Sequence, residues 1–310
     1  MTVENVLILA AGAGTRMGEI GKILPKVLWP VFERSLLELE VLYAKSLGAK
    51  NVFINSHYYT TELLGHIENN SIFENVELLI ENEPIDIGGA VHNLADKLGY
   101  RGELLILNSD QFIFVDENVW AEAFERFKTS SSVLFSYQVN SSDMYNALDV
   151  KSGRLSGIIN NSSLERNKSV KTYTGMSLIR LDDLIPCKGK SSFFDSVANF
   201  KNQNVQVVDI NDSEYWDFGT LDRYWKSCFS ILEKVHEETS DRFVSFLLNH
   251  KAILEKKVEG SCYNASSSEK VINLSDKKVS DAKNVIILSG EPRQGTEEKR
   301  IVFKSLVERI

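Results

Sequence analysis

The sequence predicts an α/β protein, a doubly wound, Rossmann-like and mostly parallel sheet followed by a small C-terminal β-rich module. Short apolar segments alternate with amphipathic ones from residue 6 to about residue 210, as in strands joined by crossover helices. The first apolar segment runs directly into Gly12 and Gly14, which is typical of a buried parallel strand ending at a ligand site. After Thr220 the pattern changes to two helical segments and then to short strands.

The first half of the chain contains the clearest alternation. We expect strands at 6–10, 51–55, 76–81 and 103–107, and helices at 35–47, 61–69 and 88–98. Ser35 and Glu38 have the spacing of a capping box, and Gly48 ends the helix that they begin. Right-handed crossovers make such strands parallel, so their carboxyl ends meet at one edge, where ligands bind.

The second half of the chain is expected to add strands to the sheet and then to form helices and a separate β-rich module. Strands are predicted at 130–139, 148–150, 155–159, 170–179 and 205–210, a polar loop at 160–169 and a helix at 193–200. Two further helices are predicted at 221–240 and 242–258, and three strands at 270–274, 284–288 and 300–303. We therefore expect a main domain at 1–230, a helical connector at 231–260 and a β-rich module at 261–310, through which copies of the chain could associate.

Composition restricts the class of protein. The net charge is -8, whereas nonspecific nucleic-acid binders usually have a basic face, so no nucleic-acid partner is expected. The apolar segment at the N-terminus is too short to span a bilayer and has no signal-peptide pattern. Cys187, Cys228 and Cys262 have no C-x-x-C spacing, which indicates free thiols in a reducing compartment. We expect a soluble, cytoplasmic protein with no membrane partner.

The glycine-rich turn after the first strand has the chemistry of a phosphate site. Glycines at positions 12 and 14 let the backbone approach an anion closely. Arg16 and Lys26 supply positive charge where a triphosphate would lie. The turn is only half of the dinucleotide fingerprint G-x-G-x-x-G, and it lacks the Gly-Lys-Ser/Thr of a Walker A loop. The expected nucleotide-binding residues of this turn are Ala10, Ala11, Gly12, Ala13, Gly14 and Thr15.

Taken with Pro25 and Lys26, this turn resembles the signature of the sugar-1-phosphate nucleotidylyltransferases, G-x-G-T-R followed by P-K. Four further segments match that family in order: ENEPIDIGGA at 81–90, LILNSD at 105–110, TYTGM at 172–176 and YWDFGT at 215–220. The resemblance covers about residues 3–225 and implies the fold of nucleotide-diphospho-sugar transferases. It implies Mg²⁺-dependent transfer of a nucleoside monophosphate from an NTP to a sugar 1-phosphate, which releases pyrophosphate.

The resemblance assigns roles to four charged residues. Arg16 would clamp the β- and γ-phosphates with its planar fork. Lys26 would lie between the α-phosphate and the incoming sugar phosphate. Asp110 and Asp217 would hold Mg²⁺, which usually takes one or two carboxylates plus phosphate oxygens. No covalent nucleophile is needed, because the sugar phosphate oxygen attacks directly and pyrophosphate leaves.

The 81–90 segment is expected to bind the base. A carboxylate at Glu81 can accept hydrogen bonds from the guanine edge or from uracil N3, so we predict a preference for GTP or UTP. Gly88 and Gly89 open a predicted helix and would let the backbone approach the base or ribose. His57 lies near the same edge, although a structural histidine is favoured there.

The sugar pocket departs from the family pattern. Ile87 replaces the usual Thr, Ser109 replaces the glycine of N-G-D, and the E-K-P segment is missing. Sugar contacts are therefore predicted at Asn108, Asn160, Lys171, Thr174 and Gly175. The 144–146 segment, Met-Tyr-Asn, reads equally well as a sugar contact and as a surface loop. The chain looks most like the N-acetylmuramate-1-phosphate uridylyltransferases, followed by mannose- and heptose-1-phosphate guanylyltransferases.

Two alternative functions remain open on the sequence. The chain could be a catalytically silent regulatory or scaffold subunit of the same fold, or a cytidylyltransferase for a non-sugar phosphate. Silent relatives typically lose the loop cations or the metal carboxylates, and all four are present here. The TYTGM and YWDFGT segments argue against the second alternative, because they match the sugar-type enzymes.

Overall fold

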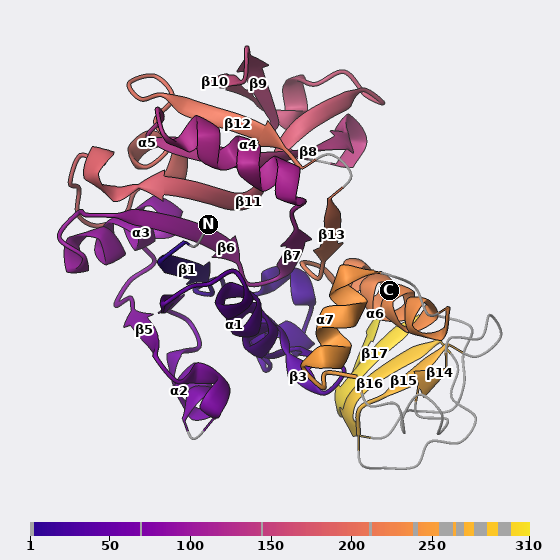
Figure 1. Cartoon of the computed structure of the whole chain (residues 1–310). Coiled ribbons are helices and arrows are strands. Elements are labelled where there is room, and N and C mark those ends of the chain that lie inside the picture. Colours follow the sequence, from indigo (N-terminus) through magenta and orange to yellow (C-terminus); the bar gives the residue numbers. More distant parts are fainter. Residues whose placement is uncertain are drawn as a thin grey trace.

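A mixed sheet forms the centre of the protein in the computed structural model (Figure 1). The structure describes residues 3–68, 70–143, 145–210, 213–237, 241–253, 263–264, 270–275, 284–290 and 299–310. Over these residues the large sheet has nine strands in the order β5-β4-β1-β6-β11-β8-β12-β10-β9. Its strands are β1 (Asn5–Leu9), β4 (Asn51–Ser56), β5 (Val76–Ile80), β6 (Glu103–Asn108), β8 (Ser132–Asn140), β9 (Ala147–Lys151), β10 (Arg154–Ile159), β11 (Ser169–Arg180) and β12 (Val205–Asp209).

The predicted α/β class and mostly parallel sheet are confirmed. β5, β4, β1 and β6 are parallel neighbours, and β12 is parallel to β8. β11 pairs antiparallel with both β6 and β8, and β10 is antiparallel to β12 and β9. Every strand of this sheet except β10 and β11 therefore runs in the same direction. Periodicity could not reveal the reversal, because a buried strand has the same apolar pattern in either direction.

Helices flank the sheet as the alternation predicted. They are α1 (Leu36–Ser46), α2 (Thr60–Ile67), α3 (Asp86–Lys97), α4 (Glu117–Phe127), α5 (Phe193–Ser196), α6 (Leu221–His236) and α7 (Arg242–Asn249). The capping box of α1 is confirmed, since Ser35 accepts from the Glu38 N–H and the Glu38 carboxylate accepts from the Ser35 N–H. Three predicted bounds were wrong: α3 begins at Asp86 rather than residue 88, α5 ends at Ser196 and α7 ends at Asn249.

The edge at which β1, β4 and β6 end determines where a ligand can bind. β1 is buried along most of its length, with Val6, Leu7 and Ile8 inaccessible to solvent. Its last residue, Leu9, is in register with Asn55 of β4 and with Asn108 of β6. Two amide side chains therefore lie on either side of the end of β1, directly before the glycine turn. Asn55 gives the backbone at the start of the turn a hydrogen-bond partner, because its Oδ1 accepts from the Ala10 N–H.

A two-stranded ribbon connects distant parts of the chain beside this edge. β7 (Gln111–Phe114) pairs antiparallel with β13 (Glu214–Asp217), so that Gln111 stands opposite Asp217. A second short ribbon joins β2 (Pro30–Val31) to β3 (Arg34–Ser35). The β7–β13 ribbon brings the segment after β6 next to the segment before α6, about a hundred residues later in the chain.

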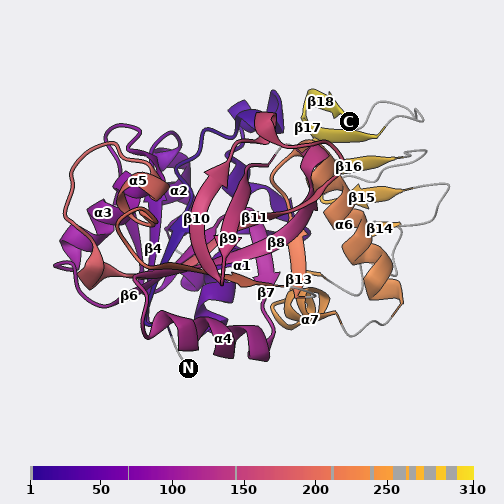
Figure 2. The ribbon, with the colours of Figure 1, turned by 90° about the horizontal axis from the view of Figure 1, so that it is seen from above.

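A separate five-stranded sheet makes up the described part of the C-terminal region. Its order is β14 (Tyr263–Asn264), β15 (Val271–Asn273), β16 (Val285–Gly290), β17 (Arg300–Lys304) and β18 (Leu306–Arg309). The three predicted C-terminal strands are thus confirmed. In Figure 1, α6 and α7 lie between this sheet and the large one, and Figure 2 shows α6 beside the strands of the C-terminal sheet.

The C-terminal sheet shares the hydrophobic core of the main body. Ile272, Ile286 and Ile301 are in register on neighbouring strands, are buried and belong to the main core. On the opposite face, Val271, Val285, Ile287 and Val302 form a small cluster of their own. This period-two alternation explains why one face packs onto the body.

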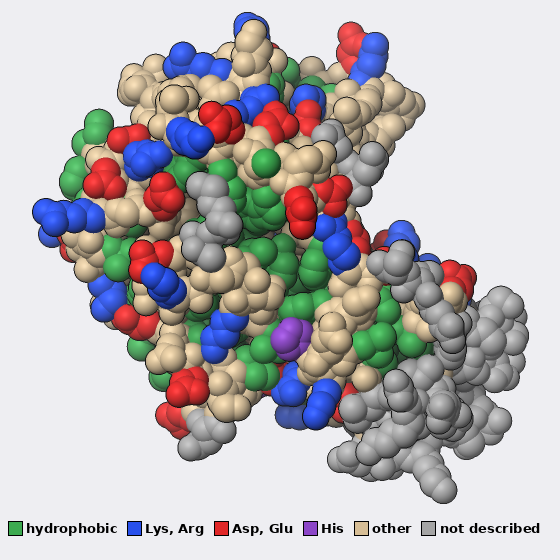
Figure 3. Space-filling view, in the orientation of Figure 1, with side chains coloured by type: hydrophobic (Ala, Val, Ile, Leu, Met, Phe, Trp, Pro, Cys, Tyr) green, Lys and Arg blue, Asp and Glu red, His purple; other side chains and the backbone are tan. Residues whose placement is uncertain are grey.

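Figure 3 shows one face of the whole molecule, on which acidic and basic side chains are interspersed and neither forms a continuous patch. Among the described residues, no helix combines the length and the apolar character that crossing a bilayer requires.

Candidate active site

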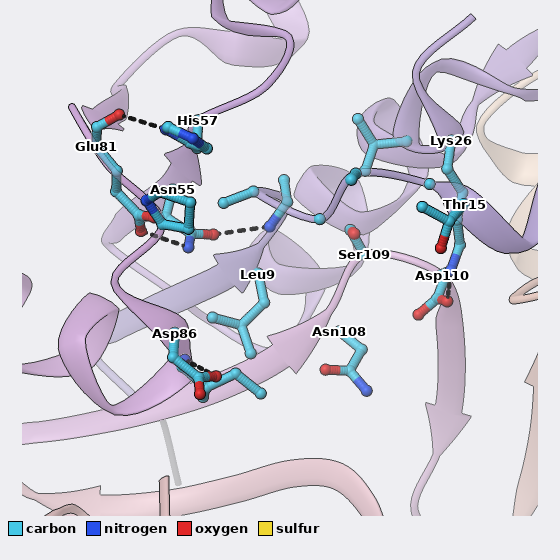
Figure 4. A pocket seen from close by; sticks show the side chains of 18 of the residues that line it. Leu9, Thr15, Lys26, Asn55, His57, Glu81, Asp86, Asn108, Ser109 and Asp110 are labelled. Carbon is cyan, nitrogen blue, oxygen red and sulfur yellow. Dashed lines mark hydrogen bonds and ion pairs between the residues drawn. The ribbon is translucent and has the colours of Figure 1, made fainter. Parts of the chain in front are cut away.

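A cavity of about 490 Å³ opens at the carboxyl ends of β1, β4 and β6. Its lining residues come from five parts of the chain: 9–16, 26–27, 55 and 57, 81 and 84–87, and 108–110. Figure 4 shows its two ends, with Lys26 and Asp110 on one side and Asn55, His57 and Glu81 on the other. The structure therefore brings together most of the residues that the sequence predicted for an NTP.

The glycine turn forms the floor of the cavity between these two ends. Residues Ala10 to Thr15 all line it. A Cβ on Gly12 would meet nothing within 4 Å, so the turn is open at this position, and Gly14 has a φ of 63°, which favours glycine. Arg16 lies in the 3₁₀ turn η1 (Thr15–Met17), lines the same cavity and is exposed. Its guanidinium is thus available to an anion in the cavity.

Lys26 and Asp110 form an ion pair at the phosphate end of the cavity. The Lys26 ammonium donates to Asp110 Oδ2, and the two side chains are 14% and 11% exposed. Pro25 precedes the 3₁₀ turn η3 (Lys26–Leu28) and fixes the backbone from which the lysine projects. The pair satisfies both charges while no ligand is bound, which lowers the cost of placing them in a largely buried position.

Asp217 lies next to this ion pair, although 107 residues separate it from Asp110 in the sequence. The Phe218 N–H donates to the Asp110 carbonyl at 2.9 Å, which continues the β7–β13 pairing. A Cβ placed on Gly219 would stand 2.9 Å from Asp110 Oδ2, 2.9 Å from Asp217 Oδ1 and 3.7 Å from Lys26 Nζ. Glycine at this position therefore keeps open the space that the two carboxylates and the ammonium share.

The shared space fits a hard divalent cation. Within the described residues, no group of three or more His, Cys, Asp or Glu side chains is arranged to hold a metal. Two carboxylates facing one gap suit Mg²⁺, which commonly takes one or two protein carboxylates and completes its shell with phosphate oxygens and water. Asp217 is oriented by three donors, namely the Gly219 N–H at 2.6 Å, Arg223 Nη1 at 2.9 Å and the Tyr215 hydroxyl at 3.3 Å.

A buried carboxyl group lies behind the ion pair. Glu40 of α1 is inaccessible to solvent, and neither of its oxygens has a hydrogen-bond partner. Burial, with a smaller contribution from the charge of Asp110, raises the pKa of Glu40 well above its ordinary value. No motif marks Glu40, because a carboxylate within a largely apolar helix gives no signal of its surroundings.

Glu81 forms the opposite end of the cavity together with Asn55. Asn55 Nδ2 donates to Glu81 Oε1 at 2.7 Å, while Asn55 Oδ1 accepts from the Ala10 N–H at 2.7 Å. The Glu81 side chain is buried, and that burial raises its pKa. His57 makes a 2.9 Å hydrogen bond through Nδ1 with the Glu81 carbonyl, which gives it the structural role that was favoured. Sequence reasoning missed Asn55, although its place at the end of a strand was a usable signal.

Gly88 and Gly89 are not among the residues that line this cavity. A Cβ on Gly88 would come within 2.5 Å of the Ser192 carbonyl, and one on Gly89 within 2.6 Å of the Gly189 carbonyl. The Gly89 N–H also donates to the Ser191 carbonyl at 3.2 Å. Close packing of α3 against the 189–196 segment accounts for both glycines, so the structure gives no support to their predicted approach to the base.

The predicted sugar contacts are only partly gathered at the site. Asn108 lines the cavity, and Gly175, with a φ of 92°, leaves room for it, since a Cβ there would overlap the Asn108 amide. Thr174 is buried, and its hydroxyl donates to the Phe135 carbonyl at 2.9 Å. These two residues thus shape the sheet beneath Asn108.

Asn160 and Lys171 do not line the cavity. The Asn160 side chain caps the 3₁₀ turn η6 (Asn161–Ser163) by accepting from the Ser162 N–H at 3.0 Å. Lys171 Nζ pairs with Asp209 Oδ2 at 2.5 Å. The charge of Lys171 is therefore already matched, which argues against its use as a substitute for the missing E-K-P segment.

A second hollow, of about 360 Å³, has Asp217 in its lining and shares no lining residue with the cavity at the glycine turn. Three tyrosines and two basic side chains line it together with one aliphatic, one acidic and one hydroxyl side chain: Tyr137, Tyr145, Tyr215, Arg223, Lys226, Val139, Asp217 and Ser227. The Arg223 guanidinium lies 5.1 Å from the centre of the Tyr145 ring. Sequence reasoning named Tyr145 as an open choice and missed Arg223, which stands in the first turn of α6 where no motif marks it.

Part of the chain is similar to known nucleotidyltransferases. Residues 5–154 match the model of the nucleotidyl transferase family. The chain is 27% identical over 146 residues to the D-glycero-alpha-D-manno-heptose 1-phosphate guanylyltransferase of Campylobacter jejuni, covering 47% of this chain and 63% of that one. It is 27% identical over 245 residues to the bifunctional protein GlmU of Buchnera aphidicola, covering 74% of this chain and 50% of that one. The matches thus span between half and two thirds of these relatives' lengths.

Solved structures share the fold. HddC from Yersinia pseudotuberculosis, complexed with GMP-PN, gives a TM-score of 0.61 at 21% identity and covers 74% of this chain and 99% of its own. A UDP-glucose pyrophosphorylase complexed with UDP-glucose gives 0.59 at 14% identity, covering 75% and 100%. Residues 5–154 are thus similar to the nucleotidyl transferase family, and the fold of the chain is the one found in these solved nucleotide-sugar enzymes.

Proposed function

We propose that the protein is a Mg²⁺-dependent sugar-1-phosphate nucleotidyltransferase that uses UTP or GTP. The observation that carries the proposal is the meeting of Lys26, Asp110 and Asp217 around the space that Gly219 leaves open, beside the glycine turn. A nucleotidyl transfer joins two anions, so positive charge must be fixed between them before attack. Carboxylates in the same place would hold the metal that supplies further charge.

The nucleotide would lie along the cavity with its base at Glu81 and its phosphates over the glycine turn. Arg16, which is exposed at the mouth of the cavity, would bind the terminal phosphates with its planar fork. Lys26 would exchange its contact with Asp110 for the α-phosphate once Asp110 binds the metal. The exchange keeps each charge paired before and after binding.

The sugar phosphate would enter from the hollow on the other side of Asp217. One of its phosphate oxygens forms a bond to the α-phosphorus, the bond from that phosphorus to the bridging oxygen breaks, and pyrophosphate leaves with the electron pair. The hollow is lined by three tyrosines and by Arg223, whose polar tips and flat faces suit a sugar ring. Asn108 would contribute from the floor of the main cavity.

The base would be selected by the Glu81 carboxylate. Asn55 donates a hydrogen bond to one oxygen of the Glu81 carboxylate, and this hydrogen bond would fix the direction of the carboxylate in the cavity. A carboxylate accepts from the N–H donors of guanine or uracil and finds fewer suitable donors on cytosine or adenine. The relatives support both bases, since one curated relative is named a guanylyltransferase and one solved structure holds UDP-glucose.

The division of the chain is part of the proposal. Residues 1–230 would form the catalytic domain, 231–260 the helical connector and 261–310 an accessory module. Association of copies through that module stays a prediction.

A pyrophosphate-release screen tests the proposed function. Purified protein is mixed with Mg²⁺, each of the common NTPs and a panel of sugar 1-phosphates. Pyrophosphate is expected only when both substrates are present, with UTP or GTP preferred. Lys26→Ala should abolish release, whereas the matched Lys22→Ala should keep it, because Lys22 is 69% exposed. Release that needs no sugar phosphate, or that runs equally well with phosphocholine, would contradict the proposal.

A further inference from the structure

The C-terminal sheet reaches back to the loop that carries Arg16. The carboxylate of Glu308, in β18, accepts from the N–H of Glu19 and from the N–H of Ile20, the latter at 3.2 Å, although the partners are 289 and 288 residues apart. In Figure 2, β18 lies beside the turns that follow β1. These turns are η1, which contains Arg16, and η2 (Ile20–Lys22).

Glu308 occupies a position where packing alone would favour an apolar side chain. It is in register with the buried Ile301, at the end of the row of isoleucines that faces the main body. Its neighbours on the same face, Leu306 and Ile310, pack against the main core. A half-buried carboxylate between two apolar contacts loses part of its hydration. Hydrogen bonds from the two backbone N–H groups compensate for the lost hydration. Unlike apolar packing, they also fix the direction of the contact.

The loop is shaped to receive this carboxylate. Gly18 joins η1 to η2 with a φ of 62°, and a Cβ on it would stand 2.4 Å from Glu308 Oε1 and 2.8 Å from Oε2. A side chain at position 18 would therefore meet the carboxylate directly. Met17 and Ile20, on either side of the joint, are inaccessible to solvent. The loop is thus held by apolar packing on its inner side and by one acidic side chain at the joint.

We propose that Glu308 is a positioning residue for nucleotide binding, through which the C-terminal sheet fixes the loop that presents Arg16 to the triphosphate. The inference rests on the proposed function, because it assumes that Arg16 binds the NTP. Its physical basis is pre-organisation: a loop that occupies its binding-competent form only part of the time weakens apparent affinity by that fraction. The contact with Glu308 would keep the loop in that form before the nucleotide arrives.

The first experiment measures the contact without any ligand. Hydrogen exchange of the Glu19 and Ile20 amides is followed by NMR in the full-length protein, in Glu308→Ala and in Glu308→Gln. Exchange should speed up about ten-fold in Glu308→Ala and less in Glu308→Gln, which keeps an oxygen acceptor. The matched control is Val307→Thr, because Val307 is on the opposite face of β18 and is 36% exposed. Unchanged exchange at both amides in Glu308→Ala would overturn the inference.

The second experiment measures the consequence for the nucleotide. Steady-state kinetics should give a KM for the NTP raised about five- to ten-fold in Glu308→Ala, with kcat within about two-fold and the KM for the sugar phosphate unchanged. Glu308→Gln should recover part of the loss. A merely structural role would lower the melting temperature and affect both substrates alike. A lower KM for the NTP would also overturn the inference, because the contact would then restrain the loop.

A double-mutant cycle separates the contact from general destabilisation. Gly18→Ala alone should raise the KM for the NTP further than Glu308→Ala does, because a Cβ would collide with the carboxylate and strain a left-handed backbone. In the Glu308→Ala background the same change should have a smaller effect. Strict additivity would contradict the inference. If the wild type binds no NTP at all, the proposed function fails first, and the hydrogen-exchange result still decides whether the contact exists.

Discussion

The proposed nucleotide end and the proposed sugar end of the site are built in different ways. The cavity proposed for the nucleotide is formed by contiguous segments at the ends of neighbouring strands, and its glycine turn, Lys26 and Asp110 were all singled out from short motifs. The hollow beside Asp217 is formed by side chains from strands, a loop and a helix far apart in sequence, such as Tyr137, Tyr145 and Arg223. Backbone-built sites leave a pattern in the sequence, whereas sites built from scattered side chains do not.

The largest expected effect is at the junction of the two regions. Asp110→Asn removes one of the two carboxylates around the shared space and leaves Lys26 without its ion pair. We expect turnover to fall at least about 100-fold, as when a group that stabilises developing charge is lost. The exchange is nearly isosteric, so the fold should be kept, but the thermal midpoint should fall because Lys26 loses its partner in a largely buried position.

Asp222→Asn is the matched control for that change. Asp222 lies in the first turn of α6, pairs with the exposed Lys226 and is itself 44% exposed. Its variant should retain full turnover in the pyrophosphate assay. Equal activity of the Asp110 and Asp222 variants would remove the basis for a metal site at the junction.

A change at Arg223 tests whether the second hollow serves the sugar. Arg223→Gln removes the ion pair with Asp217 and the stacking on Tyr145. The KM for the sugar phosphate should rise about ten-fold, the value expected for one charge-assisted hydrogen bond, while the KM for the NTP stays within two-fold, since Arg223 does not line the first cavity. The kcat should fall as well, because Asp217 loses one of the three donors that orient it. Arg223→Lys should fall in between, because lysine keeps the charge and loses the planar fork. An effect confined to the NTP would place the sugar elsewhere.

A change at Glu81 tests whether this residue binds the base. Its effect on KM is expected to be similar to that of Arg223→Gln or smaller. Glu81→Gln should raise the KM for the preferred NTP about ten-fold and reduce its preference over the other bases. Burial raises the pKa of Glu81, so its accepting form is lost as the pH falls through that raised value. The KM of the wild type should therefore increase toward acid pH, and that of Glu81→Gln should not. Glu83→Gln, at an exposed position two residues away, is the control. A pH profile shared by wild type and Glu81→Gln would contradict the assignment.

Substitution of Glu40 should have the smallest effect on activity and a measurable effect on the free energy of unfolding. Its pKa is raised in the folded protein, so the unfolded chain releases this proton first as the pH rises. The wild type should then lose stability from about pH 4.5 upward, by at most about 1.4 kcal/mol per pH unit for this group. Glu40→Gln should lack this dependence and unfold at a higher urea concentration at pH 8, with turnover within two-fold. Glu62→Gln, on the exposed face of α2, should unfold like the wild type at both pH values.

The features that the sequence could predict are those that depend on neighbouring residues, and the features that it could not predict depend on long-range contacts. The capping box of Ser35 and Glu38, the order of the strands along the chain and the glycine turn all depend on neighbours in sequence, and these were predicted. The reversal of β11, the ribbon that brings Asp217 to Asp110 and the packing of Gly88 against the 189–196 segment depend on long-range contacts. Lys171 shows the same limit, because only the structure reveals that Asp209 already pairs with it.

The most direct test of the account is a crystal structure with Mn²⁺ in place of Mg²⁺ and a non-hydrolysable analogue of the preferred NTP. The anomalous signal of the metal should lie between Asp110 and Asp217, with Lys26 on the α-phosphate and the base at Glu81. A metal bound to the triphosphate but away from both carboxylates, or a triphosphate placed outside the glycine turn, would contradict the account.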